Sequence, residues 1–287
     1  MKLKGLNALV TGGSHGFGEA ICEHYLREGA NVIFCGRDEE ALITTRERLQ
    51  KLASPGQKID ARQCDVSAGG EVEDLVTFVF STIGSLDILV CNAGIYGPMG
   101  ATESVDMDEW RRAIEINLFG VLLPCRAFIP HFKKQRRGKI VVISGGGATN
   151  PLPNLSAYAA SKAAVVRLME TLAVELRPFS IDVNAIAPGA LATRLVDEVL
   201  AAGPDKVGAE FFEKNRQWKE KGATPLHLGA GLAVYLAGPE SNGITGKLIS
   251  AQWDPWPELD RYRDELAKSD IYCLRRIVPE DRGKKWS

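Results

Sequence analysis

Tyr158 and Lys162 stand four residues apart near the start of an expected helix over residues 156–178. Side chains at this spacing share one face of a helix, so the lysine ammonium lies close to the tyrosine. A tyrosine hydroxyl ordinarily has a pKa of about 10, and a nearby ammonium favours the phenolate. The pair predicts a tyrosine that exchanges a proton near neutral pH, although the same spacing is common in helices without any chemistry.

A glycine-rich segment near the N-terminus, VTGGSHGFGEAI, is the second candidate for chemistry. It follows an expected strand and opens an expected helix. Glycines at Gly12, Gly16 and Gly18 allow a tight turn and let a pyrophosphate approach the backbone. The N–H groups at the helix N-terminus attract an anion. The segment predicts a dinucleotide-binding turn, and a purely structural turn is the alternative.

The elements that must position these groups alternate between strand and helix. Strands rich in Val, Ile and Leu are expected at residues 6–11, 30–35, 87–91, 139–144, 181–187 and 246–250, with a weaker one near KIDARQC. Helices are expected at residues 16–29, 38–52, 69–83, 106–133 and 156–178. This alternation predicts an α/β fold, a doubly wound Rossmann-type parallel sheet of about seven strands covered on both faces.

Composition sets limits on the partners and the location. The 287 residues carry a formal net charge of -1, so there is no basic footprint for nucleic acid or for a membrane surface. No apolar run approaches the roughly 20 residues that a membrane helix needs. The six cysteines form no CxxC pair and no cluster with histidine, so no metal site is expected. We expect reduced thiols and a cytoplasmic protein.

Several motifs follow the glycine segment in order. They are CDV at 64–66, CNAG at 91–94, Asn117 in IEINLFG, YAASK at 158–162 and APGALAT at 187–193. Together with the Gly-x-x-x-Gly-x-Gly spacing, they resemble the short-chain dehydrogenase/reductase family over about residues 4–250. The resemblance implies an NAD(P)-dependent oxidoreductase that acts on a small carbonyl or secondary alcohol. It also implies a homo-oligomer, often a homotetramer built through the helices at 106–133 and 156–178.

The resemblance further assigns roles to single residues. It implies that Tyr158 is the general acid/base and that Lys162 lowers its pKa and holds the nicotinamide ribose. It implies that Asn117 interrupts its helix to hold a water behind Lys162. The expected cofactor contacts are Gly12, Ser14, His15, Gly16, Phe17, Gly18, Arg37, Asp65, Val66, Asn92, Ala93, Gly94, Tyr158, Lys162, Pro188, Gly189 and Thr193.

The end of the second strand, FCGRDEE, bears on the choice of cofactor. An acidic residue there selects NAD, whereas an arginine can hold the 2′-phosphate of NADP. Gly36 takes the acidic position and Arg37 follows it, which favours NADP(H). Asp38 is expected to cap the next helix, although it could reach the ribose. An NAD-dependent alcohol or sugar dehydrogenase is therefore the alternative.

The catalytic serine of the family falls on a glycine in this chain. It is expected thirteen residues before Tyr158, at Gly145, and Ser144 stands one residue early. Neighbouring side chains of a strand face opposite ways, so Ser144 reaches the site only if the following glycines let the chain bulge. Thr149, Asn150 and Asn154 are the other candidates. A dinucleotide-binding protein with little turnover is a further alternative.

Two segments fall outside the alternation of strands and helices. Residues 190–224, with Phe211, Phe212 and Trp218, predict a lid over the substrate, or else amphipathic helices packed on the body. The domain is expected to cover residues 1–251. The extension at 252–287 is expected to pack on it or on a neighbouring subunit, with Trp253 and Trp256 at the pocket, at a subunit contact or on the surface. Acyl thioesters, sugars, steroids and small ketones all remain possible substrates.

Overall fold

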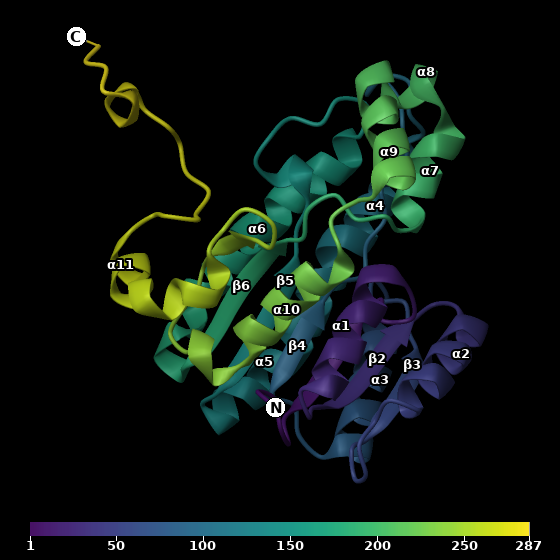
Figure 1. The fold of residues 1–287 in the computed structure, drawn as a ribbon, viewed down its shortest axis with the longest axis vertical. Helices are drawn as coiled ribbons and strands as arrows, with labels where there is room; N and C mark the ends of the chain where they lie inside the picture. The colour runs from purple at the N-terminus through teal and green to yellow at the C-terminus, as the bar shows by residue number, and fades with distance from the viewer. Residues whose placement is uncertain (287) are drawn as a thin grey trace.

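The computed structural model describes residues 1–286 and contains one parallel sheet with the strand order β3-β2-β1-β4-β5-β6-β7 (Figure 1). The strands are β1 Asn7–Thr11, β2 Asn31–Gly36, β3 Ile59–Gln63, β4 Ile88–Cys91, β5 Gly138–Ile143, β6 Ile181–Ala187 and β7 Leu248–Ser250. Every adjacent pair is parallel. The predicted doubly wound fold is confirmed, including the weak third strand.

Most of the helices were predicted from the sequence. They are α1 Gly16–Arg27, α2 Glu39–Gln50, α3 Gly69–Ile83, α4 Met107–Ile114, α5 Gly120–Gln135, α6 Ser156–Leu176, α7 Arg194–Ala202, α8 Pro204–Val207, α9 Ala209–Lys221, α10 Leu226–Ala237 and α11 Arg263–Lys268. The first six helices correspond to the predicted helical segments, α7 to α9 fall in the segment predicted as a lid or amphipathic helices, and α10 and the short α11 were not predicted. The α10 sequence LHLGAGLAVYLA is apolar all round, so it lacks the periodic stripe that identifies a half-exposed helix.

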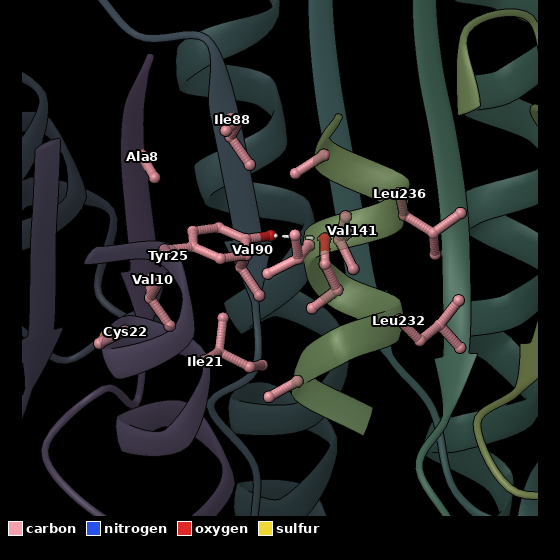
Figure 2. Close-up of a cluster of buried hydrophobic side chains, with 14 of the residues drawn as sticks. Ala8, Val10, Ile21, Cys22, Tyr25, Ile88, Val90, Val141, Leu232 and Leu236 are labelled. Carbon is pink, nitrogen blue, oxygen red and sulfur yellow. Dashed lines mark hydrogen bonds between the residues drawn. The ribbon is translucent and has the colours of Figure 1, made fainter. Parts of the chain in front are cut away.

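The core has two layers, because successive residues of a strand point to opposite faces of the sheet. Val10 packs among residues of α1 and α10, whereas its neighbour Leu9 packs with residues of α3, α5 and α6. Figure 2 shows the first layer, in which Tyr25 of α1 reaches α10. Its hydroxyl donates a hydrogen bond to the carbonyl of Ala233, 3.0 Å away. That bond satisfies the polar end of a fully buried aromatic side chain.

The topology fixes the place of the site. β1 lies between β2 and β4, so the connections leave β1 and β4 in opposite directions along the sheet. Open parallel sheets bind ligands at such a switch point, beyond the carboxyl ends of the strands. The glycine segment follows β1 and the CNAG segment ends β4, so both lie at this edge.

The helical segment Met107–Gln135 corrects one expectation. By length and composition it is the one helix of the described residues that could cross a membrane. Val121, Cys125, Phe128 and Phe132 of this segment belong to the second core layer. Its apolar character is therefore accounted for by packing against the sheet.

The C-terminal extension begins on the body and ends away from it. Leu259 and Leu266 join the first core layer. The buried Lys247 donates from Nζ to the carbonyls of Ser269 and Ile271, each at 2.9 Å. Beyond these contacts the last residues run away from the body (Figure 1).

Candidate active site

The glycine turn joins β1 to β4 closely. Thr11 Oγ1 accepts hydrogen bonds from the backbone N–H groups of Asn92 and Ala93, at 3.0 and 3.1 Å. Asn92 Nδ2 donates to the carbonyls of Thr11 and Gly12, both at 3.0 Å. Gly12 has a φ of +63°, and a Cβ on Gly18 would overlap the carbonyl oxygen of Gly12. Larger residues would not fit this turn, which leaves open backbone at the start of α1.

The end of β2 forms a polar corner of the site. Arg37 is exposed, borders the cavity and forms no ion pair among the described residues. Asp38 caps α2, because its carboxylate accepts the N–H of Ala41 at 3.1 Å. Ser14 Oγ lies 2.9 Å from His15 Nδ1 and faces the space beside Gly36. Asp38 also borders the cavity, and its Oδ1 is the oxygen that serves the helix.

Asp65 is held in part by Arg112, which lies 47 residues further along the chain. Its Oδ1 accepts from the N–H and hydroxyl of Ser67 at 2.9 and 2.6 Å, and its Oδ2 forms an ion pair with Arg112 of α4. These hydrogen bonds, from Ser67 first and then Arg112, outweigh the effect of partial burial and lower the pKa of Asp65. A fixed, ionised carboxylate therefore borders the cavity next to Val66.

Asn117 lies behind the cavity in a local break of its helix. A π-helical turn over Glu115–Phe119 separates α4 from α5. The Asn117 amide is fully buried and pairs with the backbone of Ile95, accepting at 2.8 Å and donating at 2.9 Å. It also donates to Ser161 Oγ at 2.9 Å, and Ser161 donates to the carbonyl of Tyr158 at 2.7 Å. This chain of contacts ties the π-helical turn to the tyrosine.

Lys162 is buried and makes a short contact with β5. Its Nζ donates to the carbonyl of Ile143 at 2.9 Å and lies 5.7 Å from the centroid of the Tyr158 ring. Burial lowers the pKa of Lys162 to about 8. Burial, with a smaller contribution from Tyr96, raises the pKa of Tyr158 above its ordinary value of 10. Burial is the main cause of both shifts.

The position of the missing serine is occupied by the tyrosine itself. A Cβ built on Gly145 would overlap the Tyr158 hydroxyl and lie 3.0 Å from Cζ. The side chain of Ser144 is buried, and its Oγ has no hydrogen-bond partner among the described residues. Ser144 borders the cavity but makes no hydrogen bond to Tyr158. Thr149 and Asn150 also border it, whereas Asn154 does not.

A single cavity of about 1160 Å³ connects these groups. All predicted contacts border it except Asn117: Gly12, Ser14, His15, Gly16, Phe17, Gly18, Arg37, Asp65, Val66, Asn92, Ala93, Gly94, Ser144, Tyr158, Lys162, Pro188, Gly189 and Thr193. The predicted lid contributes Phe211 and Trp218, but not Phe212. One ligand pocket typically measures about 300–1,000 Å³, so this cavity has room for a cofactor and a substrate together.

Comparison with known proteins assigns the chain to a family, in agreement with the fold and the site described above. A family model described as short chain dehydrogenase matches residues 6–202. The chain belongs to the short-chain dehydrogenase/reductase family. It is therefore an oxidoreductase of a family that binds NAD(P) and acts on small molecules, and the confirmed fold and motif order agree with that membership.

Relatives within the short-chain dehydrogenase/reductase family differ in cofactor and substrate. The glucose 1-dehydrogenase of Gluconobacter oxydans is 38% identical over 259 residues, which cover 86% of this chain and 91% of the relative. A variant of the actinorhodin polyketide ketoreductase with NADPH has a TM-score of 0.78 and 30% identity, covering 86% and 95%. An NAD+-bound xylitol dehydrogenase has a TM-score of 0.78 and 25% identity, covering 87% and 98%.

Three contacts in this site were not predicted from the sequence. Arg112 beside Asp65 is 47 residues distant along the chain. Tyr96 packs edge-on against Tyr158 with ring centroids 4.7 Å apart. Ser161, inside the YAASK motif, links Asn117 to Tyr158. Only Ser161 carried a signal in the sequence, through its place in that motif.

Proposed function

We propose that this chain is an NADP(H)-dependent reductase that interconverts a carbonyl and a secondary alcohol, with Tyr158 as the general acid/base. The observation that carries the proposal is geometric: Tyr158 and Lys162 border one cavity with the glycine turn. The Tyr158 hydroxyl keeps its proton at neutral pH, since its ordinary pKa is about 10 and burial raises it. A protonated phenol beside the reacting oxygen serves the direction of carbonyl reduction, in which that oxygen gains a proton.

The residues of the cavity fit a dinucleotide. NADPH, when bound, supplies the hydride that reaches the carbonyl carbon. The glycine turn would hold the pyrophosphate, Asp65 the adenine and Lys162 the nicotinamide ribose. Tyr158 would give its proton to the substrate oxygen, and Asn117 would hold the water that returns a proton by way of Lys162. The hydrogen bonds from Asn117 through Ser161 to the backbone carbonyl of Tyr158 would fix the asparagine beside α6 for this role.

The corner at the end of β2 supports NADP(H) over NAD(H). Arg37 is an exposed guanidinium without an ion-pair partner in residues 1–286, and it suits a 2′-phosphate. Asp38, the residue that would repel the phosphate, already accepts the N–H of Ala41. Ser14 and His15 lie beside the same corner and can donate further hydrogen bonds.

A second candidate function is dinucleotide binding with little turnover. The observation in its favour is Ser144, whose buried Oγ makes no hydrogen bond to Tyr158. No side chain of the described residues is hydrogen-bonded to the Tyr158 hydroxyl as a family serine would be. Under this alternative, NADPH binds but no carbonyl compound is reduced.

Two experiments separate these candidates. The first compares NADPH and NADH affinity, for which we expect tighter binding of NADPH. The second follows NADPH oxidation with a panel of ketones and aldehydes, for wild type and Tyr158→Phe. Loss of at least about 100-fold in kcat with unchanged NADPH affinity supports general acid catalysis by Tyr158. Wild-type inactivity over the whole panel, with NADPH bound, supports the second candidate.

We also propose a cytoplasmic homo-oligomer. All six cysteines are free, and five of them are buried, which suits a reducing compartment. Size-exclusion chromatography with light scattering tests the oligomeric state, for which we expect a tetramer.

A further inference from the structure

We infer that the substrate of this site is an uncharged, mainly apolar carbonyl compound with at least one ring, held between α9 and the loop that follows β7. This inference rests on the proposed function, since it deepens the description of the same site. It is carried by the side chains that border the cavity beyond Tyr158, on the side away from the glycine turn.

The helix α9 turns its aromatic side chains toward the cavity. Phe211 and Trp218 are seven residues apart, so they lie on one face of the helix, and both are half-buried at the cavity wall. Most charged residues of α9 pair with one another, and Lys219 pairs with Asp197 of α7 at 2.6 Å. The ion pairs within the helix are Glu210 with Lys214 at 2.6 Å, Glu213 with Arg216 at 2.9 Å, and Arg216 with Glu220 at 3.5 Å. The helix therefore offers the cavity an apolar and aromatic face.

Trp253 provides an aromatic group from a different element. It follows β7, where its backbone N–H donates to Ser250 Oγ at 3.2 Å. Its side chain borders the cavity and is 79% exposed. Packing against a ring of the substrate would remove much of this exposed indole surface from water, because aromatic side chains bury a large area. Leu152 and Leu195 add aliphatic surface to the same part of the cavity.

The charged side chains in this part of the cavity already have partners. Arg194 forms an ion pair with Glu198 at 3.1 Å. Asp254 accepts the backbone N–H of Ser250 at 2.6 Å. A carboxylate or phosphate held against α9 and Trp253 would lose water and find Arg194 already paired with Glu198, so its desolvation would be poorly compensated. The cavity therefore disfavours oxo acids and acyl thioesters that carry phosphates close to the reacting group.

The polar side chains nearby are engaged with one another as well. Asn150 Nδ2 donates to Thr149 Oγ1 at 3.1 Å, and Thr224 Oγ1 donates to Gln252 Oε1 at 3.0 Å. A sugar presents several hydroxyls, each of which needs a partner once it leaves water. In this set only Asn150 Oδ1 and Gln252 Nε2 make no hydrogen bond among the described residues, which is too few for several hydroxyls, so a sugar is disfavoured too.

The test uses purified protein with NADPH and three probes. These are β-tetralone, a derivative with a carboxylate on its aromatic ring, and D-glucose with NADP+ for the reverse reaction. We expect kcat/KM for β-tetralone to exceed that for the carboxylate by about 100-fold or more. We expect Phe211→Ala, Trp218→Ala and Trp253→Ala each to raise KM for β-tetralone about tenfold. Phe212→Ala is the matched control, since it lies on α9 but does not border the cavity.

Binding measurements keep this inference separate from the proposed function. Quenching of tryptophan fluorescence reports whether β-tetralone binds the protein loaded with NADP+, whether or not it reacts. Binding that depends on Phe211 and Trp218, without turnover, would support the inference and contradict the proposed function. Preference for D-glucose or the carboxylate, equal effects of the Phe212 and Phe211 variants, or absence of β-tetralone binding would overturn the inference.

Discussion

The hydroxyl of Tyr158 lies in the space that a side chain at position 145 would need. A Cβ on Gly145 would overlap that hydroxyl and come within 3.0 Å of Cζ and 3.3 Å of Cε1. The Tyr158 ring also meets Tyr96 edge-on, with centroids 4.7 Å apart. Tyr158 is therefore packed against an aromatic ring and bare backbone, where the family pattern would place a serine hydrogen bond.

Restoring the family serine is expected to impair the enzyme. Gly145→Ser introduces atoms where Tyr158 Oη now lies, and the tyrosine must move. Overpacking of this kind costs about 1–3 kcal/mol, which is roughly tenfold in rate for each 1.4 kcal/mol. We expect kcat to fall about tenfold or more, measured by NADPH oxidation. Gly146→Ser is the control, because nothing lies within 4 Å of a Cβ there. A higher kcat in Gly145→Ser would show that the chain simply lacks a serine.

Tyr96 is expected to be a positioning residue for Tyr158. Tyr96→Ala removes a ring that packs edge-on against Tyr158, so we expect kcat to fall about fivefold in the wild-type background. In the Gly145→Ser background the same change makes room for the tyrosine, so its effect should shrink or reverse. Kinetics of the four proteins, with Tyr96→Phe as the conservative control, measure this coupling. Strictly additive effects would contradict it.

The fold could be predicted from the sequence because each strand is a short run of β-branched and aliphatic residues bounded by turns. α10 could not, since its uniform apolar character leaves no period to recognise. Burial against α1 decides its conformation, and that contact joins residues 208 positions apart, such as Tyr25 and Ala233.

The candidate site was likewise predictable only in part. Motif spacing brought Asn92, Asp65 and Lys162 to one cavity, because the carboxyl ends of parallel strands meet at one edge. The contacts that tune these groups were not predictable, since the ion pair of Arg112 with Asp65 depends on how α4 packs. The burial that raises the pKa of Tyr158 was not predictable either, because a sequence pattern gives the neighbouring charge but not the exclusion of water.

The pH dependence of stability should report the burial of Lys162. Its pKa is about 8 in the fold, against an ordinary value of 10.5. The unfolded chain thus binds more protons between these values, so stability should rise as pH increases through this window. Below about pH 8 both states are protonated and the full penalty of the buried charge is present. Urea unfolding from pH 7 to 10 should therefore show a steeper rise for wild type than for Lys162→Met, by up to about 3 kcal/mol.

Equal slopes for the two proteins would mean that Lys162 keeps its ordinary pKa in the fold. Lys219→Met is a suitable control, because Lys219 is exposed and pairs with Asp197 on the surface. We expect this variant to follow the wild-type slope.

Cofactor preference should depend on Arg37. The guanidinium borders the cavity at the end of β2 and forms no ion pair among the described residues, and a charge-assisted hydrogen bond to a phosphate is worth about 1.5–3 kcal/mol. Arg37→Ala should therefore weaken NADPH binding about tenfold to 100-fold and leave NADH binding nearly unchanged, measured by cofactor fluorescence. Arg46→Ala is the matched control, because Arg46 lies on the neighbouring α2, pairs with Asp60 and does not border the cavity. Equal NADPH affinity in wild type and Arg37→Ala would remove the main support for NADP(H). Tighter binding of NADH by the wild type would instead favour the role of an NAD-dependent dehydrogenase.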